Sequence, residues 1–465
     1  MRGKTLITTT QNRISSNPVI KGTLILTLTG ILTRFIGFYN RIFLNNLIGA
    51  KELGIYQLIF PLYIVAFSIT TMGNELALTK LVSEFMGRND EKSARSFLST
   101  CLIINLTLST MTSVFFCTNA NFLSSKLLNT SSCGDCLKIL SIGIPFMSAK
   151  GAIHGYFLGM KRSDIHGISD FIEQIVKVFG LYIIATYLTK KTVFTASFAV
   201  IGIVIGEIAS FLYSLFTLLN YFHKSSKAHT KCCCPSNLNK QPIYTQKIIS
   251  IFLRNSIPLT ANRFILTLLQ STEAILIPTF LLNYYHDWAL SLSTYGIFSG
   301  MAFPFIMFPA TITNSLSTML LPAVSGAHSE LKTKYLNRII NKSLCFCLLI
   351  GISSATVFFL SGNMIGNLVF HNKEAGIFLY RLSFLCPLIY LATTLASILN
   401  GLDLATHNLM LTVLATGIRL SSILLLVPRY GMHGYIFGLF VSYIFLTLSS
   451  CRKLNHVINH PFYQK

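Results

Sequence analysis

Two arginines, Arg34 and Arg41, lie seven residues apart inside one apolar segment near the start of the chain. Seven residues is close to two helical turns, so both side chains project from one helix face, about 10 Å apart. Guanidinium groups suit bidentate contacts with phosphate and carboxylate, and two of them on one face cannot neutralise each other. The pair therefore predicts either a phosphate-bearing anionic ligand or structural ion pairs with Glu75 or Glu273.

Further charged residues interrupt other apolar segments. An ionisable side chain at bilayer depth costs about 2.5–3.5 kcal/mol on insertion scales, so each one needs a partner or a function. Glu173 and Lys177 are four residues apart with the acid first, which is the favourable order for an ion pair on one helix. Arg263 and Glu273 share a segment that follows Pro258, where a broken helix can face a cavity. The remaining charged residues in apolar segments are Lys150, Asp170, Glu207, Arg254 and Arg419.

These charges divide into two candidate roles. The basic residues predicted to contact an anionic ligand in a cavity are Arg34, Arg41, Arg263 and Lys177. The carboxylates predicted as their charge partners, or as coupling groups, are Glu75, Glu173 and Glu273. Two alternatives stay open: Glu173 and Lys177 neutralise each other, and Lys150 and Arg254 extend to the membrane surface.

The elements that hold these residues are predicted to be membrane-spanning helices. Of the 465 residues, 52% are hydrophobic and 11% are charged, whereas soluble proteins carry roughly 25% charged residues. Apolar segments of membrane-spanning length recur along the chain. The sequence therefore predicts an all-α polytopic membrane protein of about twelve transmembrane helices. The predicted spans are 18–45, 53–79, 96–117, 137–160, 167–188, 194–222, 248–282, 294–324, 339–361, 376–400, 404–427 and 431–451.

The basic residues predict the orientation of these helices. The net charge is +22, which by itself would suggest a nucleic-acid partner. The Lys and Arg residues, however, fall mainly in the short segments between spans, and alternate segments hold about three times as many. Under the positive-inside rule this asymmetry places both termini in the cytoplasm. We therefore expect a multi-pass protein of the cell membrane and no nucleic-acid partner.

The second half of the sequence repeats the first. A shift of 242 residues places Gly54 on Gly296, Val82-Ser83 on Val324-Ser325, Lys92 on Lys334, Pro145 on Pro387, Gly159 on Gly401 and Lys177 on Arg419. Gly202, Gly206 and Ser210 match Gly434, Gly438 and Ser442 after a change in loop length. Six helices in each half give two lobes of the same orientation, related by an axis along the membrane normal. This arrangement predicts a central cavity between lobes that rock against each other.

The domain organisation follows from this repeat. We expect a cytoplasmic N-terminal tail at 1–17, an N-lobe at 18–222, a cytoplasmic linker at 223–246, a C-lobe at 247–451 and a cytoplasmic C-terminal tail at 452–465.

The motifs of enzymes are missing from the sequence. It contains no P-loop, metal-ligand run, nucleophile elbow or Gly-rich dinucleotide turn. We therefore expect no enzymatic activity, no cofactor and no metal. Without an ATP-binding motif, uphill transport would depend on an ion gradient or the membrane potential. Cys133, Cys136 and the Cys232–Cys234 triplet are interpreted as incidental thiols.

Several short segments resemble the family of stage V sporulation protein B. They are Arg34-Phe35-Ile36-Gly37-Phe38-Tyr39-Asn40-Arg41, Leu53-Gly54-Ile55-Tyr56-Gln57, Leu81-Val82-Ser83-Glu84, His154-Gly155-Tyr156-Phe157-Leu158-Gly159-Met160, Glu173-Gln174-Ile175-Val176-Lys177 and Leu320-Leu321-Pro322-Ala323-Val324-Ser325. The ordered set spans nearly the whole chain. One departure is Glu273, where family members usually have Asp.

This family is part of the multidrug/oligosaccharidyl-lipid/polysaccharide (MOP) exporter superfamily, with the lipid II flippase MurJ. The resemblance implies a MATE-like two-lobed fold and a polyprenyl-diphosphate-linked glycan as substrate, expected to be lipid II or a close relative for spore-cortex peptidoglycan synthesis. It also implies that Arg34 and Arg41 contact the diphosphate. Family members often have fourteen helices, two more than we predict here.

Two other functions are compatible with the sequence. One is a drug or organic-cation antiporter on the same fold, although the excess of basic residues disfavours a cation site. The other is a scaffold that recruits cell-wall synthases without transporting anything, which would not require paired membrane arginines. Cell-wall synthases also remain candidate partners of a flippase.

Overall fold

The protein is helical throughout the part that its computed structural model describes, which is residues 18–88, 90–126, 128, 130, 133–188, 194–229, 245–329 and 333–459. Its first helices are α2 (Pro18–Phe67), η1 (Ser68–Met72), α3 (Gly73–Gly87), α4 (Glu91–Thr118), α5 (Ala120–Lys126), α6 (Cys133–Gly159), α7 (Ser163–Leu188) and α8 (Ala196–His229). They are followed by α9 (Thr245–Tyr285), α10 (Trp288–Gly296), η2 (Ile297–Ala302), α11 (Phe303–Ile306), α12 (Ala310–Ser329), α13 (Thr333–Phe370), α14 (Lys373–Leu382), η3 (Ser383–Leu385), α15 (Cys386–Gly401), α16 (Ala405–Leu425), α17 (Val427–Tyr430) and α18 (Met432–Asn459).

Ten helices in the described residues are long and apolar enough to cross a membrane. A helix satisfies all its backbone hydrogen bonds internally, which is why such segments fold this way in lipid. The first of the ten, Leu28–Gly87, holds two of the predicted spans. A further predicted span, 167–188, lies in α7, which is not among the ten. The prediction of a polytopic all-α protein with about twelve spans is therefore confirmed.

A single glycine separates the first two spans. Gly49 interrupts α2 with a φ of 76° and a ψ of 172°. Residues with a side chain rarely adopt this backbone conformation, whereas glycine does so at little cost. The turn falls in the interval that the hydropathy pattern leaves between 45 and 53.

The chain divides into two compact units. Unit 1 consists of Met1–Gly37 and Ile59–Leu268, and unit 2 of Phe38–Leu58 and Leu269–Lys465. Both α2 and α9 therefore contribute residues to each unit. The lobe boundaries that the sequence repeat suggests, 18–222 and 247–451, stay a prediction. The expected N-terminal tail, most of the linker with Cys232–Cys234, and the end of the C-terminal tail lie outside the described residues.

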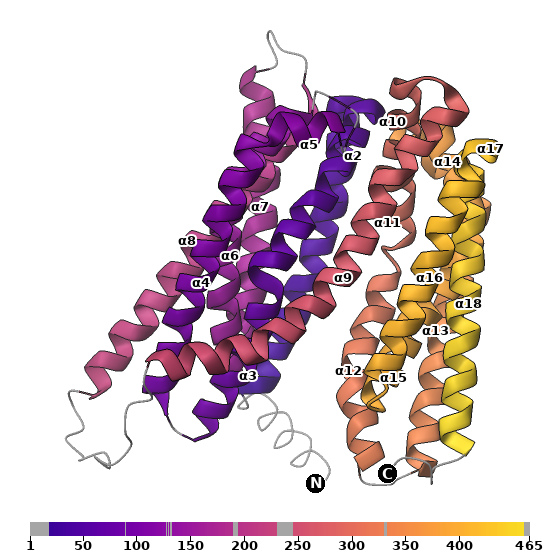
Figure 1. The fold of residues 1–465 in the computed structure, drawn as a ribbon. Coiled ribbons are helices and arrows are strands. Elements are labelled where there is room, and N and C mark those ends of the chain that lie inside the picture. The colour runs from indigo at the N-terminus through magenta and orange to yellow at the C-terminus, as the bar shows by residue number, and fades with distance from the viewer. Residues whose placement is uncertain are drawn as a thin grey trace, which may run out of the picture. The chain divides into compact units, whose positions relative to one another are not determined.

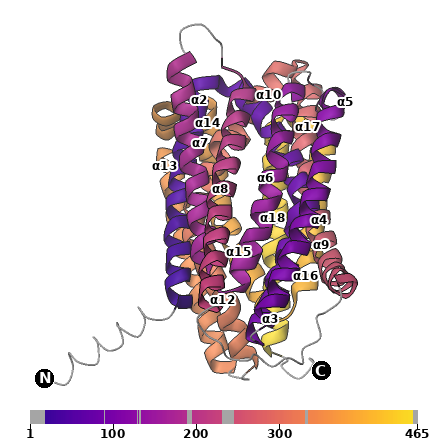
Figure 2. The ribbon, with the colours of Figure 1, turned by 90° about the vertical axis from the view of Figure 1, so that its left-hand side faces the viewer.

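In unit 1, α6 contacts α3, α4 and α8, and α7 lies along α8. Figure 2 shows α7 beside α8 and α6 beside α4. Small residues allow the closest of these approaches. Gly151, Gly155 and Gly159 follow one another at helical spacing on α6, and a Cβ on Gly155 would lie 2.8 Å from the Glu75 carbonyl oxygen. This glycine stripe holds α6 against η1 and α3.

Unit 2 repeats this packing with its own helices. α15 contacts α12, α13 and α18, and α16 lies along α18 (Figure 1). A Cβ on Gly159 would meet Val82 at 2.7 Å, and one on Gly401 would meet Val324 at 3.0 Å. Both the glycine and its neighbour are related by the shift of 242 residues. The internal repeat seen in the sequence is thus present in the packing of the helices.

Candidate functional site

Arg34 and Arg41 both lie on α2 but belong to different units. Arg34, in unit 1, is exposed, whereas Arg41, in unit 2, is half-buried and interacts electrostatically with Tyr56. Among the described residues of its own unit, neither guanidinium forms an ion pair with a carboxylate. The alternative in which Arg34 pairs with Glu75, or Arg41 with Glu273, is therefore not what the structure contains.

The other two candidate basic residues have different surroundings. Arg263 is exposed on α9. Lys177 is half-buried on α7, where its Cβ lies 3.3 Å from the position that a Cβ on Gly206 of α8 would take. The structure thus places Lys177 at the α7–α8 contact.

Unit 1 contains a cavity of about 300 Å³ lined by several charged residues, which we call the acidic cavity. Its walls come from α2, α3, α6, α7 and α8. The lining residues are Thr33, Tyr63, Phe67, Glu75, Met147, Lys150, Gly151, His154, His166, Asp170, Glu173, Gln174 and Glu207. Two of the predicted site residues, Glu75 and Glu173, line this cavity, while Arg34, Arg41, Arg263 and Lys177 do not.

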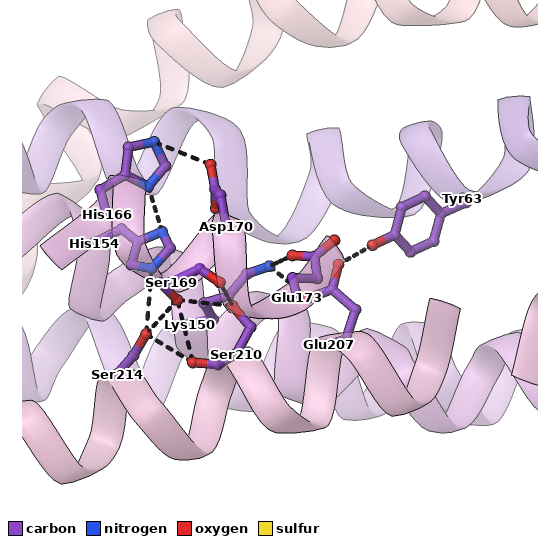
Figure 3. Close-up of polar contacts among 10 residues, drawn as sticks. All are labelled: Tyr63, Lys150, His154, His166, Ser169, Asp170, Glu173, Glu207, Ser210 and Ser214. Carbon is purple, nitrogen blue, oxygen red and sulfur yellow. Dashed lines mark hydrogen bonds and ion pairs between the residues drawn. The ribbon is translucent and has the colours of Figure 1, made fainter. Parts of the chain in front are cut away.

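Lys150 is the centre of the ion pairs in the acidic cavity. Its ammonium lies 2.6 Å from Glu173 Oε2 and 2.6 Å from Glu207 Oε2, and the Tyr63 hydroxyl donates a hydrogen bond to Glu207 (Figure 3). Lys150 is only 7% exposed and Glu207 only 3%. The sequence left open that Lys150 extends to the membrane surface, and this alternative is wrong. Two carboxylates draw the ammonium inward, because each would otherwise be a costly unpaired charge.

This arrangement also changes the interpretation of Glu173. The sequence spacing favours an ion pair with Lys177 on the same helix, and the ion pair that the structure contains joins Glu173 to Lys150 on α6. The contact with α6 instead links the two helices.

The acidic cavity has more negative groups than positive ones. Four carboxylates line it, from Glu75, Asp170, Glu173 and Glu207, and the one ammonium is that of Lys150. Two histidines, His154 and His166, complete the titratable set. With the histidines neutral and the carboxylates ionised, the lining has an excess of three negative charges. Such an excess in a low-dielectric site requires protons or cations to balance it.

The two histidines form a chain of polar contacts with a group of serines. His154 Nδ1 lies 2.7 Å from His166 Nδ1, and His166 Nε2 lies 3.8 Å from Asp170 Oδ2. On its other side, His154 Nε2 lies 3.3 Å from Ser214 Oγ. Ser214 belongs to a buried cluster with Ser169 and Ser210, in which the hydroxyl oxygens are 2.7–2.9 Å apart (Figure 3). The rings are therefore fixed from both sides.

Two uncharged side-chain oxygens in the cavity lining have no hydrogen-bond partner among the described residues. They are Thr33 Oγ1 on α2 and Gln174 Oε1 on α7, both buried. Buried polar atoms nearly always have partners. Their position beside the charged groups indicates that the cavity accommodates a polar occupant such as water, an ion or part of a ligand.

Unit 2 contains a smaller polar centre, which we call the Arg419 cluster. Arg419 Nε donates a hydrogen bond to Glu273 Oε1 at 2.7 Å, and the Tyr435 hydroxyl donates to the same oxygen at 2.8 Å. A second guanidinium nitrogen donates to Thr416 Oγ1 at 3.1 Å. Glu273, predicted to be a partner of the first-helix arginines, is 7% exposed and is matched by Arg419. The alternative that a first-helix arginine pairs with Glu273 is therefore not what unit 2 contains.

The sequence analysis singled out most of the charged residues of the acidic cavity but did not predict that they share one site. Lys150 and His154 are four residues apart on α6, as are His166 and Asp170 on α7. Residues at this spacing share one helix face, so both pairs were visible as signals. The sequence does not give the rotation of each helix about its own axis, and this rotation determines whether these two faces meet.

Comparison with known proteins agrees with this architecture. Residues 19–328 match the family described as polysaccharide biosynthesis protein. Stage V sporulation protein B of Bacillus subtilis (strain 168) is 26% identical over 442 residues, covering 94% of this chain and 84% of the relative. The lipid II flippase MurJ of the same organism is 21% identical over 347 residues, covering 71% of this chain and 62% of the relative.

Solved structures with a similar fold are transporters. An inward-facing multidrug resistance MATE family transporter of the MOP superfamily superposes with a TM-score of 0.68 at 13% identity, covering 91% of this chain and 95% of the other. A MOP superfamily transporter from Pyrococcus furiosus, described by its reversed binding-pocket polarity, gives a TM-score of 0.63 at 13% identity, with 96% and 97% covered. At these identities the likeness concerns the fold alone. This chain therefore belongs to the polysaccharide biosynthesis protein family and is a multi-pass membrane protein with the two-lobed fold of MOP superfamily transporters.

Proposed function

We propose that this protein is a flippase that carries a polyprenyl-diphosphate-linked glycan precursor, lipid II or a close relative, across the cell membrane by alternating access. The family match supports a role in polysaccharide biosynthesis, and one relative is itself named a lipid II flippase. The similarity to stage V sporulation protein B supports spore-cortex peptidoglycan as the product served. Both termini would face the cytoplasm, in accord with the distribution of basic residues.

This proposal depends mainly on the lack of carboxylate partners for Arg34 and Arg41 in the part of each unit that the structure describes. Both lie on a membrane-spanning helix, and neither has a carboxylate partner among the described residues of its own unit. A guanidinium at membrane depth is costly unless an anion compensates it. A diphosphate group supplies that charge, and its oxygens match the fork of guanidinium donors. We assign diphosphate contact to Arg34 and Arg41, with Arg263 and Lys177 as further cationic residues along the substrate route.

Transport in this scheme requires an energy source other than ATP hydrolysis. The acidic cavity offers one, because its excess of carboxylates, Glu75 and Glu173 among them, can exchange protons or cations as the protein changes conformation. The membrane potential is another, since one charge crossing 100 mV is worth about 2.3 kcal/mol. Glu273, by contrast, is the charge partner of Arg419. Cell-wall synthases that consume the flipped lipid are proposed as partners.

A second candidate function is export of organic cations. The acidic cavity favours it, because the carboxylates lie beside Tyr63 and Phe67, and aromatic rings with carboxylates suit cationic ligands. The whole sequence has an excess of basic residues, whereas the lining of this cavity has an excess of acidic ones. The flippase remains the better-supported function, since the family match and the arginines on α2 both point to an anionic lipid.

Binding by the purified protein separates the two functions. Polyprenyl diphosphate lipid, polyprenyl monophosphate lipid and a lipophilic cation are titrated separately, each with the intact protein and with Arg41→Ala. We expect saturable binding of the diphosphate lipid, weakened about 10-fold or more by Arg41→Ala because a charged hydrogen bond is lost. Unchanged diphosphate binding by the folded variant would remove the arginine assignment. Saturable binding of the cation alone would replace the flippase with the cation exporter.

A further inference from the structure

One end of the acidic cavity brings together three side chains that commonly bind transition metals. His154 comes from α6, and His166 and Asp170 come from α7. One donor atom from each of the three lies within 4.8 Å of the other two. His154 is buried, while His166 and Asp170 are half-buried and face the cavity. Two imidazoles and a carboxylate form a ligand set typical of divalent first-row transition metals.

The spacing of these residues along two neighbouring helices brings their side chains close together. His166 and Asp170 are one helical turn apart, which places both side chains on one face of α7. His154 lies on the neighbouring helix with its Nδ1 2.7 Å from His166 Nδ1. Figure 3 shows the His166 ring between the other two side chains, with one ring nitrogen facing His154 and the other facing Asp170.

The serine cluster is compatible with the tautomer of His154 that metal binding needs. Ser214 Oγ donates its proton to the Ser210 carbonyl oxygen at 2.9 Å. The Ser214 oxygen is then left to accept a hydrogen bond from His154 Nε2, 3.3 Å away. A neutral imidazole that donates through Nε2 has its lone pair on Nδ1, and this atom points toward His166. Such a contact behind a ligating imidazole is the usual way to orient it.

The charge of the cavity favours a dication at this position. Lys150 forms its close ion pairs with Glu173 and Glu207, so among the described residues Glu75 and Asp170 are the lining carboxylates that form no ion pair with it. A divalent ion between His154 and Asp170 would offset both negative charges. Lys150 is one turn from His154 on α6, but its two carboxylate partners reduce the repulsion that the ion would experience.

Binding an ion requires the His166 ring to move from its place between the other two ligands, where its Nδ1 faces His154 and its Nε2 lies 3.8 Å from Asp170 Oδ2. With metal–nitrogen bonds of about 2.0–2.1 Å, a tetrahedral ion separates two ligating nitrogens by roughly 3.3 Å, compared with the present 2.7 Å between the Nδ1 atoms. A rotation of the half-buried His166 ring supplies this difference. Three protein ligands leave a fourth position, which opens on a cavity of about 300 Å³. Structural zinc sites are closed by four protein ligands, whereas this one would remain accessible.

We propose that His154, His166 and Asp170 form a binding site for one divalent transition-metal ion, of the zinc(II) class, within unit 1. The bound ion would join α6 to α7 and balance the excess carboxylate charge, with the fourth coordination position open to water. Occupancy would therefore stiffen the helices that surround the cavity. This site is independent of the identity of the transported lipid.

Cobalt(II) is the probe that tests the site directly. The full-length protein in detergent, with Cys232→Ser, Cys233→Ser and Cys234→Ser to remove the thiol triplet, is titrated with Co²⁺. We expect about one equivalent to bind, with visible ligand-field bands of a nitrogen and oxygen site and no thiolate charge-transfer band. Zn²⁺ should abolish these bands by displacement. Zn²⁺ should also raise the unfolding temperature of the same protein.

Matched variants locate the ion. His166→Ala and Asp170→Asn should each weaken Co²⁺ binding at least 10-fold, whereas His407→Ala, a half-buried histidine in unit 2, should leave it unchanged. The proposal is overturned if the folded protein without the thiol triplet gives no ligand-field bands, a result that needs no histidine variant to fold. It is also overturned if folded His166→Ala binds Co²⁺ as tightly as the His407→Ala control. Either result would identify the histidine contact as a hydrogen bond between neutral rings.

Discussion

The acidic cavity of unit 1 and the Arg419 cluster of unit 2 occupy helices that the internal repeat relates to each other, yet their charges differ completely. In the acidic cavity one ammonium faces two carboxylates directly, with two more in the lining. In the Arg419 cluster one guanidinium faces one carboxylate, and a tyrosine completes the hydrogen bonds. The acidic cavity is hollow and has more carboxylates than cationic groups, whereas the Arg419 cluster has one of each.

The repeat makes this difference informative. Shifts of 242 residues for α6 and α7, and of 232 for α8, give the unit 2 residues at the positions of the ionisable groups that these three helices contribute to the cavity. Those equivalents are Ala392 for Lys150, Ala396 for His154, Asn408 for His166, Thr412 for Asp170, Ala415 for Glu173 and Leu439 for Glu207. Helix packing is therefore shared by both halves, while the ionisable groups are not. Close helix packing explains why the glycines and Val82 or Val324 recur in both halves. It does not explain the charged residues, which unit 1 alone has at these positions, and we infer that these residues serve the function of the protein.

The largest effect should come from removing the cation of the acidic cavity. Lys150→Met leaves Glu173 and Glu207 without their ammonium, and an uncompensated buried charge costs about 3–5 kcal/mol. We expect a large fall in the unfolding temperature of the detergent-solubilised protein. Lys138→Met serves as the control, because the Lys138–Asp135 pair is exposed and worth about 0–1 kcal/mol. Equal unfolding temperatures for the two variants would refute the central role of Lys150.

The Arg419 cluster should respond differently, because it is balanced. Arg419→Met alone should destabilise unit 2 by about 3 kcal/mol, since it leaves Glu273 buried and unpaired. Adding Glu273→Leu removes the second charge and should bring the loss back to about 1 kcal/mol. The equivalent double change in unit 1, Lys150→Met with Glu207→Leu, should show little recovery because Glu173 remains. Similar recovery in both units, measured by thermal unfolding, would contradict the two charge balances.

The shared packing predicts equal effects in the two units. Gly159→Ala and Gly401→Ala each force a Cβ to within about 3 Å of an adjacent helix, and overpacking costs about 1–3 kcal/mol. Gly417→Ala is the control, since nothing lies within 4 Å of its added Cβ, and it should be neutral or slightly stabilising. Melting curves would contradict the repeat if only one of the two contact glycines proved sensitive.

The smallest effect is expected at Glu173. Glu173→Gln leaves Lys150 paired with Glu207 and removes one of the excess negative charges. The lost charged hydrogen bond and the relieved repulsion oppose each other, so stability should change by about 1 kcal/mol or less. A fall as large as that of Lys150→Met would show that the cavity is not over-supplied with carboxylates. Thermal unfolding under the same conditions provides the measurement.

The sequence predicted the elements and the repeat because these depend on local patterns. Apolar length fixes a membrane helix, and the contacts of Gly159 with Val82 and of Gly401 with Val324 follow the offset of 242 residues. The partners of the charged residues were predicted less well. The sequence left open that the Lys150 side chain extends to the membrane surface. It also left open an ion pair between Glu273 and a first-helix arginine, whereas the structure pairs Glu273 with Arg419. Partner choice depends on which faces of separate helices meet, and spacing along one helix contains no information about that.

Movement of the labelled lipid between leaflets tests the central claim most directly. Proteoliposomes containing labelled lipid II and the intact protein, Arg34→Gln, Arg41→Gln or Arg429→Gln are compared, with and without an imposed membrane potential. Arg429, an exposed arginine on α17, is the matched control. The account predicts that the intact protein and Arg429→Gln transfer the label across the bilayer, and that both α2 variants lose at least 90% of the rate. Transfer at the rate of empty liposomes by the intact protein, or at the full rate by both α2 variants, would contradict it.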